Sequence, residues 1–341
     1  MSNLKKILVT GGAGFIGSHT VAELIDSGYV PIIVDDLSTT DRTLLNGLGE
    51  LYGQVPVFYQ VDCGDQDKLA EVFEVEKDIR AVMHFAAFKS VGESVQEPLK
   101  YYRNNINSLI SVLENMKKFN VQELIFSSSC TVYGQPEVIP VTEDAPFKKA
   151  ESPYGATKQM CERVLEDVYS SGYKIISLRY FNPVGAHPSA KIGELPAGIP
   201  NNLVPYVTQT AAGIREVLTV FGNDYPTPDG TCIRDYIHVC DVAAAHVQAL
   251  KFLEKSSLPT FEAFNLGTGK GVSVLGLIQS FENANQIKVN YRIGPRRPGD
   301  VIQVYADPSR IESAIQWKAK FTLDEAMRHS WVWQQKISAP K

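Results

Sequence analysis

The stretch that decides the fold is Ile7-Leu8-Val9-Thr10-Gly11-Gly12-Ala13-Gly14-Phe15-Ile16-Gly17. An apolar run followed by spaced glycines predicts a strand, a tight turn and a helix start, although the spacing is G-x-x-G-x-x-G rather than the commoner G-x-G-x-x-G. Glycines let backbone N–H groups approach a pyrophosphate at a helix N-terminus. Asp35 stands 18 residues after Gly17, close to the spacing of a carboxylate that binds adenosine ribose hydroxyls. The stretch therefore predicts a dinucleotide site, and the carboxylate favours NAD over NADP because it would repel a 2′-phosphate.

Outward from this stretch, short apolar runs alternate with segments of helical character. Continuous β-branched runs between helices are typical of a parallel sheet that is covered on both faces. We therefore expect an α/β protein built on a doubly wound parallel sheet, a Rossmann domain. The expected strands are 7–9, 32–34, 57–61, 81–85, 124–126 and 175–178, and the expected helices are 16–27, 66–73, 105–119 and 154–170.

The composition of the sequence changes after about residue 181. Prolines and glycines become frequent, helices are expected to shorten, and 182–183, 199–202 and 225–230 are expected to be loops. Ligands of doubly wound sheets bind at the carboxyl ends of the strands, so this second region should cap that edge. The predicted division is an NAD-binding Rossmann domain at 1–181, to which 235–262 returns, and a smaller α/β substrate-binding domain made of 182–234 and 263–341.

Composition limits the possible partners and the compartment. The 341 residues carry a net charge of -5, which argues against general affinity for nucleic acid or an anionic membrane. No apolar run approaches the roughly 18 residues of a membrane span, and residues 1–6 lead into the first strand without an export signal. The five cysteines form no C-x-x-C pair. We therefore expect a cytoplasmic protein with no metal site and no disulfides.

A tyrosine and a lysine stand four residues apart in Tyr154-Gly155-Ala156-Thr157-Lys158. On a helix these positions share one face, so the Lys158 ammonium can lie close to the Tyr154 phenol. A phenol has a pKa of about 10, and a nearby cation favours its ionised form. Lowering the pKa to about 7 needs roughly 4 kcal/mol, which an ammonium and a positively charged nicotinamide in a dry pocket could supply. Such a tyrosine could take a proton from a substrate hydroxyl while the carbon gives up hydride. The spacing is common on helix surfaces, and the nucleotide loop gives it weight.

Two further strand ends fit the same cofactor. Asp62-Cys63 closes the third expected strand, where a carboxylate can accept a hydrogen bond from an adenine amino group. Phe85-Ala86-Ala87-Phe88-Lys89 closes the fourth, and its small residues allow close backbone approach while Lys89 could reach a phosphate. Four histidines in apolar surroundings are interpreted as packed residues rather than catalysts: His19, His84, His238 and His246.

With Ser127-Ser128-Ser129-Cys130-Thr131-Val132-Tyr133-Gly134, the glycine loop and the Tyr154–Lys158 pair resemble the extended short-chain dehydrogenase/reductase family. Four more stretches narrow the resemblance to the UDP-glucose 4-epimerases of that family, along nearly the whole chain. These stretches are 84–94, 179–187, 221–227 and 234–239. The last three are specific because they lie in the substrate half, where subfamilies diverge.

The resemblance implies that Tyr154 is the base, Lys158 its electrostatic partner and a nicotinamide-ribose ligand, and Ser129 a hydroxyl bonded to the substrate 4-OH. A serine can share a proton without adding a charge that competes with the phenolate. The cofactor contacts that it implies are Gly11, Gly14, Phe15, Ile16, Gly17, Asp35, Asp36, Asp62, Cys63, Phe85, Ala86, Ala87, Lys89, Asn104, Ser129, Tyr154, Lys158, Tyr180 and Phe181.

The resemblance also implies a UDP-sugar site. Arg234 and Arg297 would clamp a diphosphate with charge-assisted hydrogen bonds, and Asp300 would accept from ribose hydroxyls. Either arginine alone is as readily a solvated surface charge, but together in an acidic chain they suggest a focused anion site. The implied substrate contacts are Lys89, Ser129, Thr131, Tyr154, Asn182, Asn201, Asn202, Leu203, Phe221, Arg234, Arg297, Asp300 and Val304.

The implied reaction interconverts UDP-glucose and UDP-galactose by transient oxidation at C4, rotation of the 4-keto sugar and hydride return, with NAD retained. Related dehydratases carry Thr-Asp-Glu where this chain has Ser129-Cys130-Thr131, so dehydration lacks its acid–base pair. A net ketoreductase or sugar dehydrogenase would use the same tyrosine and lysine and stays open. A nonenzymatic NAD sensor would need no base, and the combination of Ser129, Tyr154 and Lys158 argues against it.

Two finer expectations follow from the resemblance. Val304 would lie at the sugar end of the pocket, and its small size predicts some acceptance of UDP-N-acetylhexosamines. A homodimer would use the helices at 105–119 and 154–170. The apolar residues of the first of these helices could equally face their own core: Ile106, Leu109, Val112 and Leu113.

Overall fold

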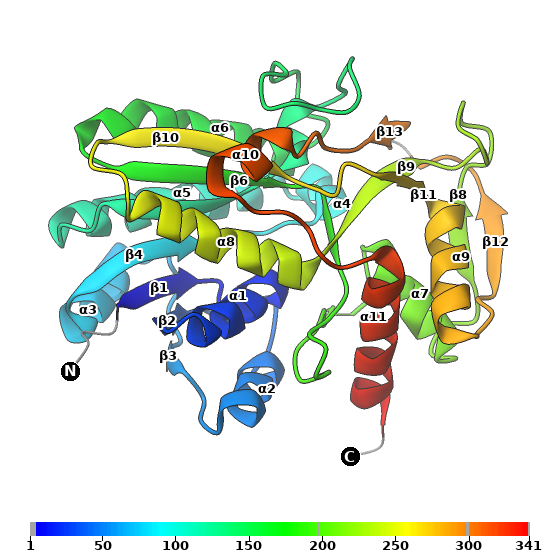
Figure 1. Cartoon of the computed structure of the whole chain (residues 1–341), viewed down its shortest axis with the longest axis horizontal. Coiled ribbons are helices and arrows are strands. Elements are labelled where there is room, and N and C mark those ends of the chain that lie inside the picture. Colours follow the sequence, from blue (N-terminus) through cyan, green and yellow to red (C-terminus); the bar gives the residue numbers. More distant parts are fainter. Residues whose placement is uncertain (1–4, 197, 298–299, 340–341) are drawn as a thin grey trace.

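A seven-stranded sheet forms the centre of the molecule (Figure 1). The computed structural model describes residues 5–196, 198–297 and 300–339. Every neighbouring pair in this sheet is parallel, and the strand order is β10-β6-β5-β4-β1-β2-β3. The strands are β1 (Lys6–Thr10), β2 (Val30–Val34), β3 (Val57–Tyr59), β4 (Ile79–His84), β5 (Glu123–Ser129), β6 (Lys174–Tyr180) and β10 (Thr260–Leu266).

Helices cover both faces of this sheet, and each face has its own apolar core. On one face, α1 (Phe15–Asp26) packs beside α8 (Val239–Leu253), and on the other, α5 (Pro98–Lys118) packs against α3 (Gln66–Glu76) and α6 (Pro153–Val168). Two shorter helices, α2 (Thr43–Tyr52) and α4 (Val91–Gln96), follow β2 and β4. The strands are buried on both sides, which explains their continuous apolar sequences.

Most of the chain after β6, other than α8, β10 and residues 309–315, gathers at one end of the sheet, on the right in Figure 1. A four-stranded sheet contains β11 (Gly271–Ser273), β9 (Ile233–His238), β13 (Gln303–Val304) and β7 (Asn182–Val184), the last paired with β9. A two-stranded sheet pairs β12 (Tyr291–Gly294) with β8 (Leu218–Phe221). Besides α8, the helices after β6 are α7 (Leu203–Ala211), α9 (Val274–Asn285), α10 (Ser309–Ile315) and α11 (Leu323–Ser338).

The expected fold class is confirmed, and each expected strand and helix of the first half is present with shifted ends. The largest shift is at α5, which begins at Pro98 rather than at residue 105. Two expectations were wrong. Residues 182–183 are not a loop but begin strand β7, where Pro183 is tolerated because β7 pairs only with β9 among the described strands. The later helices also do not shorten, since α8 has 15 residues and α11 has 16.

The two sheets share the later part of the chain. β9 belongs to the four-stranded sheet, whereas α8 and β10 return to the seven-stranded one. By sheet membership this return covers 239–266, four residues later at each end than the expected 235–262. Asp235 of β9 joins the parts, because its buried carboxylate accepts hydrogen bonds from the N–H groups of Thr268, Gly269 and Ala306 at 2.8–3.1 Å. The neighbouring Arg234 is thereby fixed on a rigid strand.

Candidate active site

A cavity of about 370 Å³ lies at the carboxyl edge of the seven-stranded sheet. This volume falls within the usual range of ligand pockets. Its walls include the segments that follow β1, β2, β3 and β4 and the last residue of β6, together with residues of α6 and of the segment before α7. The predicted residues that it brings together are Gly11, Gly14, Phe15, Ile16, Gly17, Asp35, Asp36, Asp62, Cys63, Phe85, Ala86, Ala87, Lys89, Asn104, Tyr154, Lys158, Tyr180, Asn201 and Asn202.

The turn after β1 is shaped so that only glycine fits at two positions. Gly11 has φ +70°, and a Cβ there would lie 2.7 Å from the backbone nitrogen of Ala86. A Cβ on Gly17 would lie 2.2 Å from the Gly11 carbonyl oxygen. Helix α1 begins at Phe15, and no side chain caps its first N–H groups. Its first turn forms part of the cavity wall, so the positive end of the helix dipole lies at the cavity. This cradle suits a pyrophosphate.

Two acidic residues of the cavity, Asp35 and Asp62, are held by backbone N–H groups. Asp35, 8% exposed, accepts hydrogen bonds from Ala13 (3.1 Å) and Leu37 (3.0 Å). Burial raises the pKa of Asp35, and these two hydrogen bonds oppose that rise. Asp62 accepts from Gly64 at 2.7 Å and lies three residues beyond the end of β3. The carboxylates are therefore fixed in orientation, as a site for ribose hydroxyls and an adenine edge requires.

Helix α6 carries Tyr154 and Lys158 into the cavity. Ser152 caps the helix by accepting a hydrogen bond from the Gly155 N–H at 3.2 Å. Lys158 is 4% exposed, its Nζ donates to the Ser127 carbonyl oxygen at 2.5 Å, and it lies 4.7 Å from the Phe126 ring centroid. The Tyr154 hydroxyl is hydrogen-bonded to the side chain of Ser129. Tyrosine, serine and lysine thus converge, although Ser129 does not itself line the cavity.

Burial dominates the protonation of this cluster. It raises the pKa of Tyr154 to about 12, with the hydrogen bond from Ser129 opposing the rise. It also lowers the pKa of Lys158 to about 8. The expectation that Lys158 lowers the pKa of Tyr154 is therefore not met by the chain alone. The low dielectric of the site costs the phenolate more than the hydrogen bond with Ser129 returns to it.

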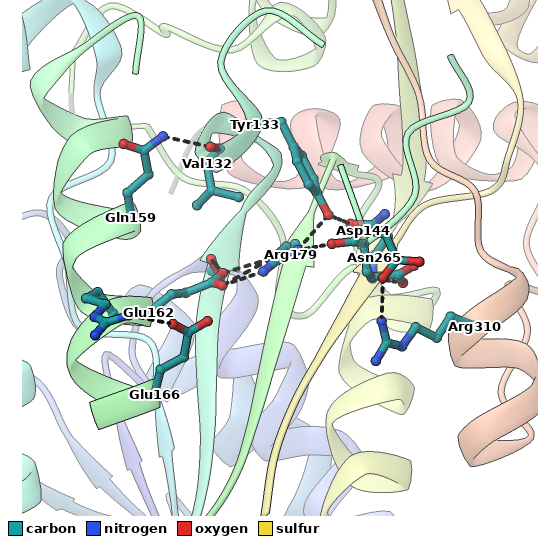
Figure 2. A network of polar contacts seen from close by, with 12 residues as sticks. Val132, Tyr133, Asp144, Gln159, Glu162, Glu166, Arg179, Asn265 and Arg310 are labelled. Carbon is teal, nitrogen blue, oxygen red and sulfur yellow. Dashed lines mark hydrogen bonds and ion pairs between the residues drawn. The ribbon is translucent and has the colours of Figure 1, made fainter. Parts of the chain in front are cut away.

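A buried polar network ties α6 to the strands behind it (Figure 2). The Glu162 carboxylate accepts from Arg179 Nη2 at 2.7 Å and from Ser128 Oγ at 2.5 Å. Arg179 Nη1 donates to the Tyr133 hydroxyl at 2.9 Å, and that hydroxyl donates to Asn265 at 2.6 Å. Glu162 lies one turn after Lys158 and Ser128 lies one residue before Ser129. The network therefore fixes the catalytic helix against the end of β5, and the sequence interpretation had missed it.

The cavity lining also contains Glu194, an acidic residue that the sequence interpretation did not predict. Glu194 Oε1 accepts from Asn202 Nδ2 at 2.5 Å and lies 3.6 Å from Lys89 Nζ. The Glu194 carbonyl oxygen accepts from the Trp333 indole at 2.8 Å, which anchors this segment to α11. Lys89, expected to reach a phosphate, is thus held by a carboxylate of the second half. The Pro- and Gly-rich composition around Glu194 gave no signal for this role.

The predicted UDP contacts are only partly assembled. Asp300 Oδ1 lies 2.8 Å from Arg297 and 3.6 Å from Arg234, so one carboxylate joins both arginines. Val304 is 6% exposed and packs in an apolar cluster with Val132 and Tyr133 rather than at the cavity. Among the described residues, the cavity lining does not include Ser129, Thr131, Phe181, Asn182, Leu203, Phe221, Arg234, Arg297, Asp300 or Val304.

Several lining residues were not predicted, and most follow the predicted ones in sequence. Ser38, Thr39 and Thr40 follow the Asp35-Asp36 pair after Leu37, and their position beyond a predicted ribose contact could have indicated them. Glu93 and Tyr101, which hydrogen-bond to each other at 2.7 Å, come from α4 and α5. Their approach depends on how those helices pack, which local sequence does not encode.

Comparison with known proteins agrees with this geometry. The family model described as GDP-mannose 4,6 dehydratase matches residues 8–330. The UDP-glucose 4-epimerase of Bacillus subtilis (strain 168) is 50% identical over 330 residues, which cover 96% of each chain.

Two solved structures are also close to this chain. The UDP-glucose 4-epimerase of Stenotrophomonas maltophila, with bound NAD and formylated UDP-arabinopyranose, is 48% identical with a TM-score of 0.94, over 98% of this chain and 99% of that one. The enzyme of Bifidobacterium longum, in complex with NAD+ and UDP, is 45% identical with a TM-score of 0.93, over 97% and 98%. The chain belongs to the UDP-glucose 4-epimerase family.

Membership of the UDP-glucose 4-epimerase family agrees with the residues at the end of β5. The matching family model takes its description from a dehydratase, but this chain has Ser129-Cys130-Thr131, without the two acids that resemblance assigns to dehydratases there. Among the described residues, no cluster of His, Cys, Asp or Glu side chains could hold a metal ion. None of the described helices is long and apolar enough to cross a membrane.

We predict that Glu162→Gln lowers the free energy of unfolding by about 3 kcal/mol, because it leaves the buried Arg179 guanidinium without its counter-charge. The matched control is Glu166→Gln, one turn later on α6, where the carboxylate pairs with Arg163 at 3.7 Å on the surface. That change should cost less than about 1 kcal/mol. Chemical denaturation measures both values, and equal losses would contradict a special role for the buried pair.

Proposed function

We propose that this chain interconverts UDP-glucose and UDP-galactose by transient oxidation at sugar C4. The observation that carries the proposal is the convergence of Tyr154, Ser129 and Lys158 beside the glycine cradle, in a chain of this family. Relatives with closely similar structures were solved with bound NAD and with UDP or a UDP-sugar. The fixed carboxylate of Asp35 favours NAD over NADP, since it would repel a 2′-phosphate.

The cofactor contacts in this proposal follow from the cavity walls. The first N–H groups of α1 and the backbone near Ala86 would hold the pyrophosphate, and Asp35 would accept from the adenosine ribose hydroxyls. Asp62 would face the adenine amino group. Lys158 would bind the nicotinamide ribose. A bound nicotinamide supplies a hydride acceptor and donor at C4 and adds a positive charge to the site.

Side chains of the protein remove the proton from the sugar 4-oxygen and return it. Tyr154 takes that proton as base and returns it as acid, and Ser129 holds the 4-oxygen close to the phenol. Lys158 favours the phenolate by its charge, and a second positive charge in the same dry cavity would work in the same direction. The burial of Tyr154 excludes water that would otherwise screen these charges.

The nucleotide half of the substrate would be held by the second half of the chain. Arg234 and Arg297 would clamp the diphosphate, with Asp300 turning toward ribose hydroxyls, and Asn182, Asn201 and Asn202 would contact the uridine side. Leu203 and Phe221 would add apolar contact. Because the sugar is anchored through UDP, it can turn over and present its other face, which inverts C4 without net oxidation.

The domain division stays part of the proposal. An NAD-binding Rossmann domain at 1–181, with 235–262 returning to it, would meet a UDP-sugar-binding domain of 182–234 and 263–341 at the cavity. Supporting this division, the cavity walls come from both halves. We also propose a cytoplasmic location, supported by five cysteines that are all free.

We predict that the purified chain converts UDP-galactose to UDP-glucose over many turnovers without added NAD. Tyr154→Phe should lower kcat by at least about 100-fold, because general base catalysis of this kind contributes 10²–10⁴-fold. A coupled assay for UDP-glucose measures both. A dehydrogenase would stop after at most one turnover, and a nonenzymatic sensor would retain its function in the Tyr154→Phe variant.

We predict a measurable rate on UDP-GlcNAc beside UDP-glucose, from the small Val304 at the expected sugar end of the pocket. Val304 packs beside Val132 and Tyr133 in the structure, so the measurement compares the two substrates in the unsubstituted enzyme. The UDP-glucose rate shows that the enzyme is folded and active. Good activity on UDP-glucose with no detectable rate on UDP-GlcNAc in the unsubstituted enzyme would contradict this.

We also propose a homodimer through α5 and α6. Leu109, Val112 and Leu113 face their own core, but Leu99, Ile110 and Met160 of these helices are 78%, 39% and 46% exposed. Exposed apolar side chains on adjacent helices suit an interface. Sedimentation equilibrium should give twice the chain mass of 37.7 kDa, and a monomer at micromolar concentration would refute the proposal.

A further inference from the structure

A second phenol lies in the catalytic cavity, and it is bonded to a buried histidine. Tyr180, at the end of β6, lines the cavity and is 5% exposed. Its hydroxyl oxygen lies 2.6 Å from Nε2 of His246. His246 belongs to α8, is 0% exposed, and packs 4.7 Å from the Phe85 ring between centroids. The histidine therefore stands behind the cavity wall and does not reach it.

The contacts of His246 fix where its proton lies. Nδ1 is 2.8 Å from the Val242 carbonyl oxygen, which can only accept, so Nδ1 carries the hydrogen. Burial lowers the pKa of His246 to about 4, with the Val242 carbonyl opposing that shift, so the ring is neutral at pH 7. Nε2 is then a bare acceptor, and the Tyr180 hydroxyl donates to it.

On its other side Tyr180 connects to the catalytic lysine. The Tyr180 hydroxyl is also hydrogen-bonded to the Ser127 side chain, and because its single hydrogen goes to His246, its oxygen accepts from Ser127. The Ser127 carbonyl accepts from Lys158 Nζ at 2.5 Å. A continuous string thus crosses the central sheet from α8 through β6 and β5 to α6. We call His246, Tyr180, Ser127 and Lys158 the cross-sheet string.

The cross-sheet string distinguishes the two phenols. Burial raises the pKa of Tyr180 well above that of a free phenol, and the nearby Tyr154 raises it further. Tyr180 donates its hydroxyl hydrogen to His246. The Tyr154 oxygen instead has a hydrogen bond with Ser129, which lowers the Tyr154 pKa and so favours its ionised form. The ionisable groups around the string include Tyr154 beside Tyr180, and His84, Cys161 and Glu162 around Lys158. Ser127 of β5, Phe85 after β4 and Val242 of α8 bring no charge to it.

We propose that His246 is a positioning residue for the reaction. As a permanently neutral acceptor it keeps Tyr180 protonated and oriented, and through Ser127 it keeps the carbonyl that holds the Lys158 ammonium in place. Tyr154 is then the one phenol of the cavity that exchanges its proton. This inference rests on the proposed function for its kinetic consequence, but the proton arrangement itself does not depend on it.

The kinetic test is a double-mutant cycle of His246→Leu and Tyr180→Phe, assayed with UDP-galactose. Loss of one oriented hydrogen bond predicts that His246→Leu lowers kcat by about tenfold, leaves KM within about twofold, and moves the midpoint of the kcat–pH profile. His246→Gln, whose side-chain oxygen can accept from Tyr180, should recover most of kcat. In the Tyr180→Phe background, His246→Leu should have almost no further effect on kcat.

Two kinetic outcomes would overturn the proposal. If the effects of the two substitutions multiply, His246 does not act through Tyr180. If His246→Leu lowers the melting temperature but leaves kcat and the pH profile of the folded enzyme unchanged, the histidine is only a packed core residue.

A structural test separates this inference from the proposed function. Nitrogen-15 NMR of histidine-labelled protein, without substrate, should show His246 as the neutral tautomer with hydrogen on Nδ1 between pH 6 and 9. Tyr180→Phe should shift the Nε2 resonance and leave that of Nδ1 nearly in place. A hydrogen on Nε2, or an Nε2 resonance unaffected by Tyr180→Phe, refutes the string even in an active enzyme. An inactive enzyme with the expected spectrum refutes the function alone.

Discussion

The parallel direction of all seven central strands is the constraint on which the site depends. Backbone hydrogen bonding holds neighbouring strands about 4.8 Å apart, and parallel pairing brings every carboxyl end to one edge. Gly11, Asp35, Phe85, Ser129 and Tyr180 each lie at or directly after such an end. Residues far apart in the chain therefore meet at one edge of the sheet, where all of these except Ser129 line the cavity. The second half of the chain closes this edge from the other side.

Burial sets the chemistry of the groups that meet there. Lys158, Glu162, Arg179 and His246 are each no more than 5% exposed, and each is stable only because its polar atoms have partners. The Glu162–Arg179 pair largely cancels its own charge, while the Lys158 ammonium contacts a carbonyl oxygen and an aromatic face. In the protein alone, burial makes an ionised Tyr154 costly and raises its pKa, and the hydrogen bond with Ser129 opposes that rise.

Two polar networks hold the ends of β5 and β6 in place, one on each face of the sheet. Glu162, Arg179 and Tyr133 fix α6 and the end of β5 on one side (Figure 2). His246 and Tyr180 reach the same strands from the other side. Ser127 and Ser128 are adjacent on β5 and point to opposite networks. The strand that presents Ser129 is thus held from both faces, which suits a hydroxyl that must keep a fixed distance to a phenol.

The sequence by itself determined the fold class, the glycine turn, the Asp35 carboxylate that lies beside this turn and the placement of Tyr154 and Lys158 on one helix. These features depend on local geometry: strand and helix periods, glycine at positions where a Cβ cannot fit, and a four-residue spacing on one helix face. Only the tertiary structure decided that Glu162 pairs with Arg179, that Glu194 holds Lys89, that Val304 packs in a core, and that β7 is a strand. Those outcomes depend on which distant segments pack together and on how burial weighs charge, and neither is encoded in any short stretch of sequence.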